Sequence, residues 1–189
     1  MKFNSIHRKI WSEIIERDSN YSPALYYLST TDSDREQSLR YAHSAFVADS
    51  TNKWYTANYA EKLVSSGHYT RAIPIFRRLM RIDPTNIRSY HALAVIYGYS
   101  GMPYSAISVL DSAELRIGYN YYLAEIKQEL LLSTRQYERA IEEGQRRIAE
   151  HPYDADVVTK LADVYAVAGR DSLARATYDR AFKLDTTNV

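Results

Sequence analysis

The residue types that most often carry catalysis are few in this sequence, and their spacing does not bring them together. Its five histidines are scattered from position 7 to position 151, and the zinc-binding pattern H-E-x-x-H does not occur. The segment Gly98-Tyr99-Ser100-Gly101 lacks the G-x-S-x-G spacing of a nucleophile elbow and follows a predicted helix, not a strand. With no cysteine and only six glycines, there is neither a thiolate nucleophile nor a glycine-rich phosphate loop. We therefore predict no catalytic site, no metal site and no cofactor, and we expect the protein not to be an enzyme.

Opposite charges are almost balanced along the 189 residues, with 24 Lys and Arg against 23 Asp and Glu. A net charge of +1 gives no general attraction to nucleic acid or to an anionic membrane. No run of apolar residues is long enough to span a membrane, and the first nine residues lack the apolar core of a signal peptide. The composition, 46% hydrophobic and 25% charged, predicts a soluble folded chain. It does not indicate in which cellular compartment the protein is located.

Arginine side chains gather on several predicted surface helices, at positions 77, 78, 81, 139, 146 and 147. Nucleic-acid-binding modules are usually basic overall, whereas this chain is nearly neutral. We interpret these arginines as a solvated surface and expect no nucleic-acid partner.

The helices that would position any binding residues recur at a fixed interval of 34 residues. Asp49-Ser50-Thr51-Asn52 resembles Asp83-Pro84-Thr85-Asn86, one interval later. Frames that begin at 19, 53, 87, 121 and 155 align three further sets of small residues: Ala72, Ala106, Ala140 and Ala174; Ala60, Ala94 and Ala162; and Gly67, Gly101 and Gly169. A period of this length predicts a stack of similar supersecondary units.

Each frame has the apolar spacing of two amphipathic helices. In the frame from Ile87, the first apolar stripe is Tyr90, Leu93, Ala94 and Tyr97, and the second is Ala106, Val109, Leu110 and Ala113. Between them, Gly101 and Pro103 favour a turn and a new helix start. The recurring alanines allow two antiparallel helices to pack closely, because a larger side chain would push the backbones apart.

These slots resemble the tetratricopeptide repeat, whose 34-residue unit carries conserved small and aromatic positions and a closing proline. Frame 53–86 supplies Ala60, Ala72, Phe76 and Pro84, and frame 155–188 supplies Leu161, Ala162, Tyr165, Ala174 and Tyr178. The resemblance implies an all-α fold, a right-handed α-solenoid of helix-turn-helix hairpins. It divides the chain into an N-terminal helix over 1–18, either a half repeat or a cap, and an array over 19–189. The five repeats of that array would be 19–52, 53–86, 87–120, 121–154 and 155–188.

Two frames depart from the family's pattern. In 121–154, Gln128 replaces a small residue, Gly144 an aromatic residue and Arg147 an alanine, so we expect less regular packing there. In 19–52, the polar segment 29–34 predicts a shortened first helix, with Asp32 to Asp34 capping a helix over 36–48. Ahead of the array, residues 5–17 are predicted to form a helix with Ile6, Ile10, Trp11, Ile14 and Ile15 on one face.

In the family, first helices line a concave surface that binds an extended peptide or a partner segment. The resemblance places the following residues in that groove: Trp54, Asn58, Glu61, Arg88, His91, Tyr99, Tyr122, Glu125, Glu129, Asp156, Lys160 and Asp163. Carboxylates outnumber basic groups among them, which favours a basic or polar segment of a partner protein. Chaperone-binding members hold a C-terminal carboxylate in a clamp, but only Asn58 and Arg88 fit its slots, so we do not expect that ligand.

An assembly role is the alternative to peptide binding. Solenoids usually end in a polar capping helix, and none is predicted after the helix over 173–184. We therefore expect either that the sequence is a segment of a longer protein, or that this uncapped C-terminal helix meets a partner, including a second copy of the chain.

Overall fold

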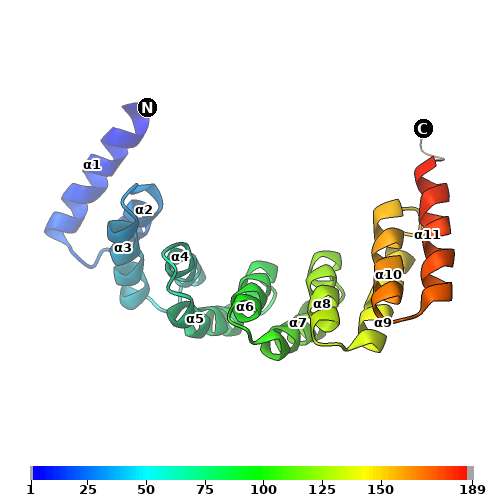
Figure 1. Cartoon of the computed structure of the whole chain (residues 1–189). Helices are drawn as coiled ribbons and strands as arrows, with labels where there is room; N and C mark the ends of the chain where they lie inside the picture. Colours follow the sequence, from blue (N-terminus) through cyan, green and yellow to red (C-terminus); the bar gives the residue numbers. More distant parts are fainter. Residues whose placement is uncertain (1, 187–189) are drawn as a thin grey trace. The chain divides into compact units, whose positions relative to one another are not determined.

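The computed structural model describes residues 2–186 of the chain, and it describes side chains from residue 6 onward. Over residues 2–186 the chain forms eleven α-helices and no strand (Figure 1). The first six are α1 (Lys2–Arg17), α2 (Ser22–Thr31), α3 (Arg35–Ala48), α4 (Lys53–Ser65), α5 (Tyr69–Ile82) and α6 (Ile87–Tyr99). The next five are α7 (Pro103–Ile117), α8 (Tyr121–Ser133), α9 (Tyr137–Glu150), α10 (Ala155–Val167) and α11 (Asp171–Thr186).

The chain divides into two compact units, an N-terminal unit of residues 1–96 and a C-terminal unit of residues 97–189. The division falls inside α6, and so within the predicted repeat 87–120. Helices α1 to α5 belong to the first unit and α7 to α11 to the second. The assignment of residues 1–18 and of five repeats to 19–189 stays a prediction.

In the N-terminal unit, each helix from α1 to α5 packs against the next along the chain (Figure 1). Small side chains lie at the contacts, where Ala24, Ala42, Ala45, Ala60 and Ala72 are all 0% exposed. Because a methyl group adds little width, the helix axes can approach closely and larger side chains fill the space beside the contact.

Polar side chains fix where two of these helices begin. The Asp34 carboxylate accepts hydrogen bonds from the backbone N–H groups of Glu36 (2.9 Å) and Gln37 (3.1 Å) at the start of α3. The bonds from Gln37 and Glu36 hold the pKa of Asp34 below its usual value. Asn52 caps α4 in the same way. With 10 residues in α2 against 13 in α4, the shortened first helix and the cap before α3 are both confirmed.

Helix α1 packs against α2. The rings of Trp11 and Tyr27 lie 5.5 Å apart, and Arg8 donates a hydrogen bond of 2.8 Å to the Asp32 carboxylate. The predicted helix is confirmed and begins earlier than residue 5. Its predicted apolar face is only partly covered, because Ile6 and Ile10 remain exposed.

In the C-terminal unit, helices α7 to α11 also pack in chain order. Ala106 and Ala140 are 0% exposed and Ala174 is 4% exposed, so this alanine slot again lies at helix contacts. Around them Leu131, Leu161 and other apolar side chains form a continuous core.

The turns α4–α5, α6–α7, α8–α9 and α10–α11 share one backbone geometry. Gly67, Gly101 and Gly169 adopt φ of 75°, 70° and 71°, a left-handed conformation that residues with a Cβ atom disfavour. After each of them, a backbone N–H bonds a carbonyl five residues earlier, as Met102 does to Tyr97 (2.9 Å). In the hairpin of α8 and α9, Arg135 takes the same conformation, with φ of 59°. The backbone conformation of this turn is therefore the same, although an arginine stands in place of the glycine.

The three unusual residues of 121–154 fit together in one polar cluster, and the less regular packing expected for that repeat stays a prediction. A Cβ atom on Gly144 would lie 2.4 Å from Nε2 of Gln128, so the missing side chain on α9 makes room for the long one on α8. Gln128 donates to the Ala140 carbonyl (3.1 Å) and accepts from Arg147 (2.7 Å). Arg147 is 1% exposed and also donates to the Tyr121 hydroxyl (3.1 Å). A polar cluster thus replaces the small-residue contact.

Candidate functional site

The N-terminal unit has a hollow of about 540 Å³ between its helices. Residues of α2, α4, α5 and α6 line it, and five of them were predicted for the groove: Trp54, Asn58, Glu61, Arg88 and His91. Its size lies within the range of pockets that hold a ligand. We call this cavity the α4–α6 hollow.

Trp54 is the most exposed aromatic side chain of the α4–α6 hollow, at 64%. The Asn52 side chain accepts a hydrogen bond from the Trp54 backbone N–H (3.0 Å), which fixes the first turn of α4. The Lys53 ammonium lies 5.4 Å from the centre of the Trp54 ring and 3.2 Å from the Asp83 carboxylate. The indole is thus held at the start of a capped helix with most of its surface open to a ligand.

A second ion pair crosses from α4 to α6. The Arg88 guanidinium lies 3.4 Å from the Glu61 carboxylate, and both side chains are largely exposed. An exposed pair of this kind contributes little to stability, because water screens both charges. Its consequence is local, since each charge offsets the other beside the hollow.

Asn58 lies deeper, with 7% of its surface exposed. Its amide donates a hydrogen bond of 2.5 Å to the hydroxyl of Ser29, which in turn donates to the Tyr26 carbonyl (2.6 Å). An asparagine amide has two donors and one oxygen that accepts twice, so this bond leaves part of its capacity unused.

Two further groups of the α4–α6 hollow are uncharged. Burial lowers the pKa of His91, which favours the neutral imidazole at neutral pH. The Ser89 hydroxyl is buried, and the described part of the chain offers it no hydrogen-bond partner. A polar group of a ligand that reached it would relieve an unsatisfied hydroxyl.

In the C-terminal unit, Glu125 and Lys160 form an ion pair with each other across α8 and α10. Glu125 also lies 3.6 Å from the buried Arg147 guanidinium. Both predicted groove residues therefore have partners within the protein. Glu125 is part of the polar cluster around Arg147 as well as of the surface.

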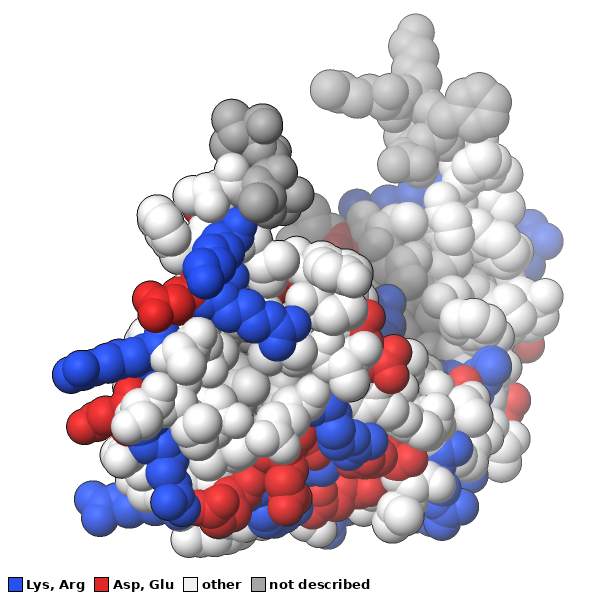
Figure 2. Space-filling model, turned by 90° about the vertical axis from the view of Figure 1, so that its right-hand side faces the viewer, with Lys and Arg blue, Asp and Glu red and all other residues white. Residues whose placement is uncertain are grey.

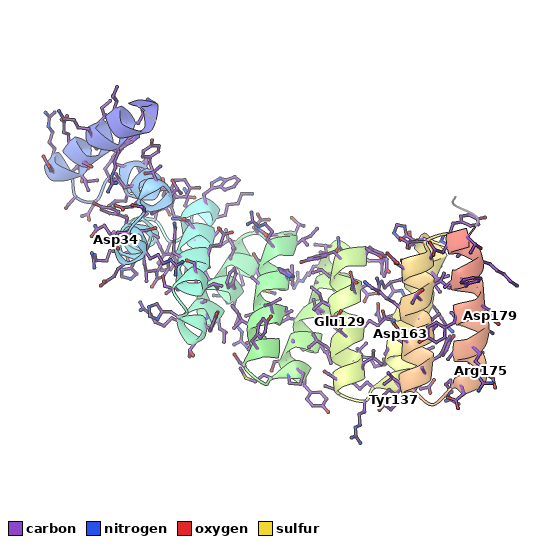
Figure 3. The ribbon with its side chains drawn as sticks, turned by 45° about the horizontal axis from the view of Figure 1, so that its top comes forward. Asp34, Glu129, Tyr137, Asp163, Arg175 and Asp179 are labelled. Carbon is purple, nitrogen blue, oxygen red and sulfur yellow. The ribbon has the colours of Figure 1, made fainter. Side chains whose placement is uncertain are left out.

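The other predicted residues of this unit are exposed. Glu129 and Asp163 lie on α8 and α10, and Figure 3 shows both on the face turned toward the viewer. The Asp163 carboxylate accepts a hydrogen bond of 2.5 Å from Tyr178, and this bond raises the pKa of the Tyr178 hydroxyl. Three further members of the predicted set are also exposed: Tyr99, Tyr122 and Asp156.

A buried ionic cluster in the C-terminal unit was not predicted from the sequence. The Lys127 ammonium, only 9% exposed, lies 2.9 Å from Asp111 and Glu114 on α7 and 2.7 Å from Glu143 on α9. Arg146 pairs with Glu114 at 2.5 Å. The only sequence signal is a lysine on the same helix face as Leu123, Ala124 and Leu131.

Opposing effects set the protonation of Glu114. Its burial disfavours the charged carboxylate, but hydrogen bonds from Lys127 and Arg146 outweigh burial and lower its pKa below the ordinary value. For Lys127, burial acts against the ammonium, and bonds to Glu143, Glu114 and Asp111 overcome it and raise the pKa. Glu114 and Lys127 are therefore ionised at neutral pH, and the ion pairs of Lys127 join α7, α8 and α9.

Within residues 2–186, no group of three or more His, Asp or Glu side chains is arranged to hold a metal ion. Among the described helices, none combines the length and the apolar character needed to cross a membrane.

Comparison with known proteins finds likeness in structure and not in sequence. No family model and no curated protein matches the chain. YrrB, described as a TPR protein with an unusual peptide-binding site, aligns with 17% identity and a TM-score of 0.70, over 92% of this chain and 91% of that one. MamA from Desulfovibrio magneticus RS-1 aligns with 15% identity and a TM-score of 0.65, over 97% and 96% of the two chains.

A third structure, a tetratricopeptide repeat protein from Parabacteroides merdae, aligns with 16% identity and a TM-score of 0.67, over 93% of this chain and 71% of that one. At such low identities the likeness shows the fold. The predicted fold class, an all-α solenoid of tetratricopeptide-type hairpins, is confirmed.

Proposed function

We propose that this chain, which has the tetratricopeptide-repeat fold, is a non-catalytic protein-interaction module that binds a peptide or partner segment in the α4–α6 hollow. The observation that carries the proposal is the meeting of five predicted groove residues, from two successive first helices, around that one hollow. The description of YrrB as a peptide-binding TPR protein adds support by analogy.

The chemistry of the hollow suits a peptide. Trp54 offers a large exposed ring, and aromatic side chains of this kind dominate the energetics of protein interfaces. Asn58 retains amide capacity beside it, and an amide can both donate to and accept from a peptide unit. Together they provide an apolar anchor and a backbone contact.

Partner capture tests the proposal. The chain and the variant Trp54→Ala are each used as bait. Overlapping synthetic peptides that cover the sequence of each captured protein are then titrated against both baits. The control is Tyr104→Ala, because Tyr104 is 68% exposed and lies on α7, outside the hollow. Loss of an interface anchor weakens binding by about 2 kcal/mol, or about 30-fold, so we expect that loss for Trp54→Ala alone. Equal binding by both variants would refute the proposal.

For the C-terminal unit, we propose that the face bearing Glu129, Asp156 and Asp163 favours a basic segment. Glu125 and Lys160 neutralise each other there, whereas Glu129 and Asp156 are exposed carboxylates. A charge reversal at Glu129 should weaken the binding of a captured basic peptide. It should not make the affinity of that peptide more dependent on salt. Unchanged affinity would remove the basic-partner proposal and leave the α4–α6 hollow untouched.

Self-association through α11 is the second candidate function. Helix α11 exposes Leu173 (51%), Tyr178 (39%) and Phe182 (70%). Figure 2 looks at the C-terminal unit from the α11 side, where uncharged residues lie between basic and acidic ones. If α11 joins two copies, light scattering will show a mass that rises with concentration, and Leu173→Lys will abolish the rise. A constant monomer mass would exclude this role.

A further inference from the structure

The charges that line the α4–α6 hollow cancel. Its charged residues are two basic ones, Lys53 and Arg88, and two acidic ones, Glu61 and Asp83. They are already paired, Lys53 with Asp83 at 3.2 Å and Arg88 with Glu61 at 3.4 Å. His91 adds no charge at neutral pH, because burial lowers its pKa. The hollow therefore has no net charge to attract a charged ligand.

A charged ligand side chain would gain little in this setting. A lysine could reach Glu61 only in competition with Arg88, and an acidic residue could reach Arg88 only in competition with Glu61. In both cases the incoming group gives up hydration for a contact with an already neutralised charge. Charge complementarity thus favours uncharged side chains.

The apolar part of the hollow selects for a ring. Trp54 is 64% exposed, and a neighbouring cation, the Lys53 ammonium, lies 5.4 Å from its ring centre. Proline and aromatic rings both pack flat against an indole, and proline also favours an extended backbone. An extended proline-containing segment also leaves its backbone groups unpaired, so that they are free to bond to Asn58.

We infer that the α4–α6 hollow takes an extended peptide segment that has no charged side chains within the hollow and sets a proline or aromatic ring against Trp54. The inference rests on the proposed function, because it presumes that the hollow binds a peptide. It specifies the chemical class of that peptide.

A phage-displayed library of random dodecapeptides, selected on the full-length chain, tests the inference. We expect enriched sequences to contain a proline or aromatic residue at a constant position and to be depleted of Lys, Arg, Asp and Glu around it. A synthetic peptide of the enriched sequence should bind Trp54→Ala about 30-fold more weakly, the loss typical of an interface anchor. It should bind Tyr104→Ala within about threefold of the parent chain, because Tyr104 lies on α7, outside the hollow.

The outcomes separate this inference from the proposed function. Enriched lysine-rich or acidic sequences whose binding still depends on Trp54 would overturn the uncharged class and leave peptide binding in place. Selection of no sequence, or of sequences that bind Trp54→Ala equally well, would overturn both. Trp54 is exposed, so far-ultraviolet circular dichroism should show that its variant keeps the parent fold.

Discussion

Replacement of Gly144 by alanine should destabilise the chain, although alanine is the better helix former. In an open position on α9 this change would stabilise the helix by about 1 kcal/mol. Here the new Cβ atom would lie 2.4 Å from Nε2 of Gln128 and 2.8 Å from Cδ1 of Leu161. Neither contact can remain, so a neighbouring side chain must move.

The cost follows from the bonds that hold Gln128. Its amide donates to the Ala140 carbonyl at 3.1 Å and accepts from Arg147 at 2.7 Å. Overpacking costs about 1–3 kcal/mol, and an unsatisfied buried polar group about as much again. After the helix gain is subtracted, we expect Gly144→Ala to lower the free energy of unfolding by about 3 kcal/mol. For a chain of this size that corresponds to a fall in Tm of about 10 °C.

Urea and thermal unfolding followed by circular dichroism at the helix band measure the effect. Gly98→Ala is a matched control, because Gly98 is also helical and its Cβ atom would meet only Leu130, at 3.8 Å. That variant should be as stable as the parent or more stable by up to about 1 kcal/mol. Removing the obstructing side chain with Gln128→Ala should make Gly144→Ala less harmful, with a coupling energy of about 1–2 kcal/mol. A Gly144→Ala chain as stable as Gly98→Ala would refute the packing argument.

Three further predictions concern charges in the C-terminal unit. Because the folded pKa of Glu114 lies below its ordinary value of 4.5, its stabilising effect is present above that pH and is lost as the pH falls through the folded pKa. When unfolding is measured across pH 3–7, the free energy of unfolding of Glu114→Gln should therefore fall less steeply toward acid pH than that of the parent. Equal slopes of the free energy of unfolding against pH would contradict this. Lys127→Met takes the nearest cation from the buried Glu143 carboxylate, which keeps only Arg146 at 3.6 Å, and should cost about 3 kcal/mol in urea unfolding, whereas a cost below about 1 kcal/mol would show that the cluster is not needed. Glu125→Lys removes the acidic neighbour of the buried Arg147 and should lower the unfolding midpoint clearly, while the exposed Glu129→Lys should change stability by less than about 0.5 kcal/mol; equal effects would refute the distinction.

The helices and their turns were predictable because their signals are local. A small residue that returns every 34 positions marks each helix contact, and the capping residues before α3 and α4 lie within three positions of the N–H groups that they bond. The turn at Arg135 was not predictable from a glycine pattern. It is held by backbone bonds that the rest of the hairpin imposes, such as the one from the Gln136 N–H to the Leu131 carbonyl (2.8 Å).

The candidate site was predictable in part. The family pattern named Trp54, Asn58 and Arg88, and in the N-terminal unit these residues line one hollow. The sequence treated Glu125 and Lys160 as independent members of an acidic groove, but they pair with each other. A count of charges along a chain cannot show which of them neutralise one another across neighbouring helices.

By itself, the sequence determined which segments are helical, where they turn and that they pack in chain order, because each of these depends on residues within one 34-residue period. Only the tertiary structure decided which side chains from different helices meet. Gln128 fits because Gly144, sixteen positions away on the next helix, has no side chain. Lys127 is tolerated in the interior because α7 and α9 bring three carboxylates to it. Burial of polar groups is favourable only when partners are in place, and those partners come from packing between helices and not from the order of residues in any one of them.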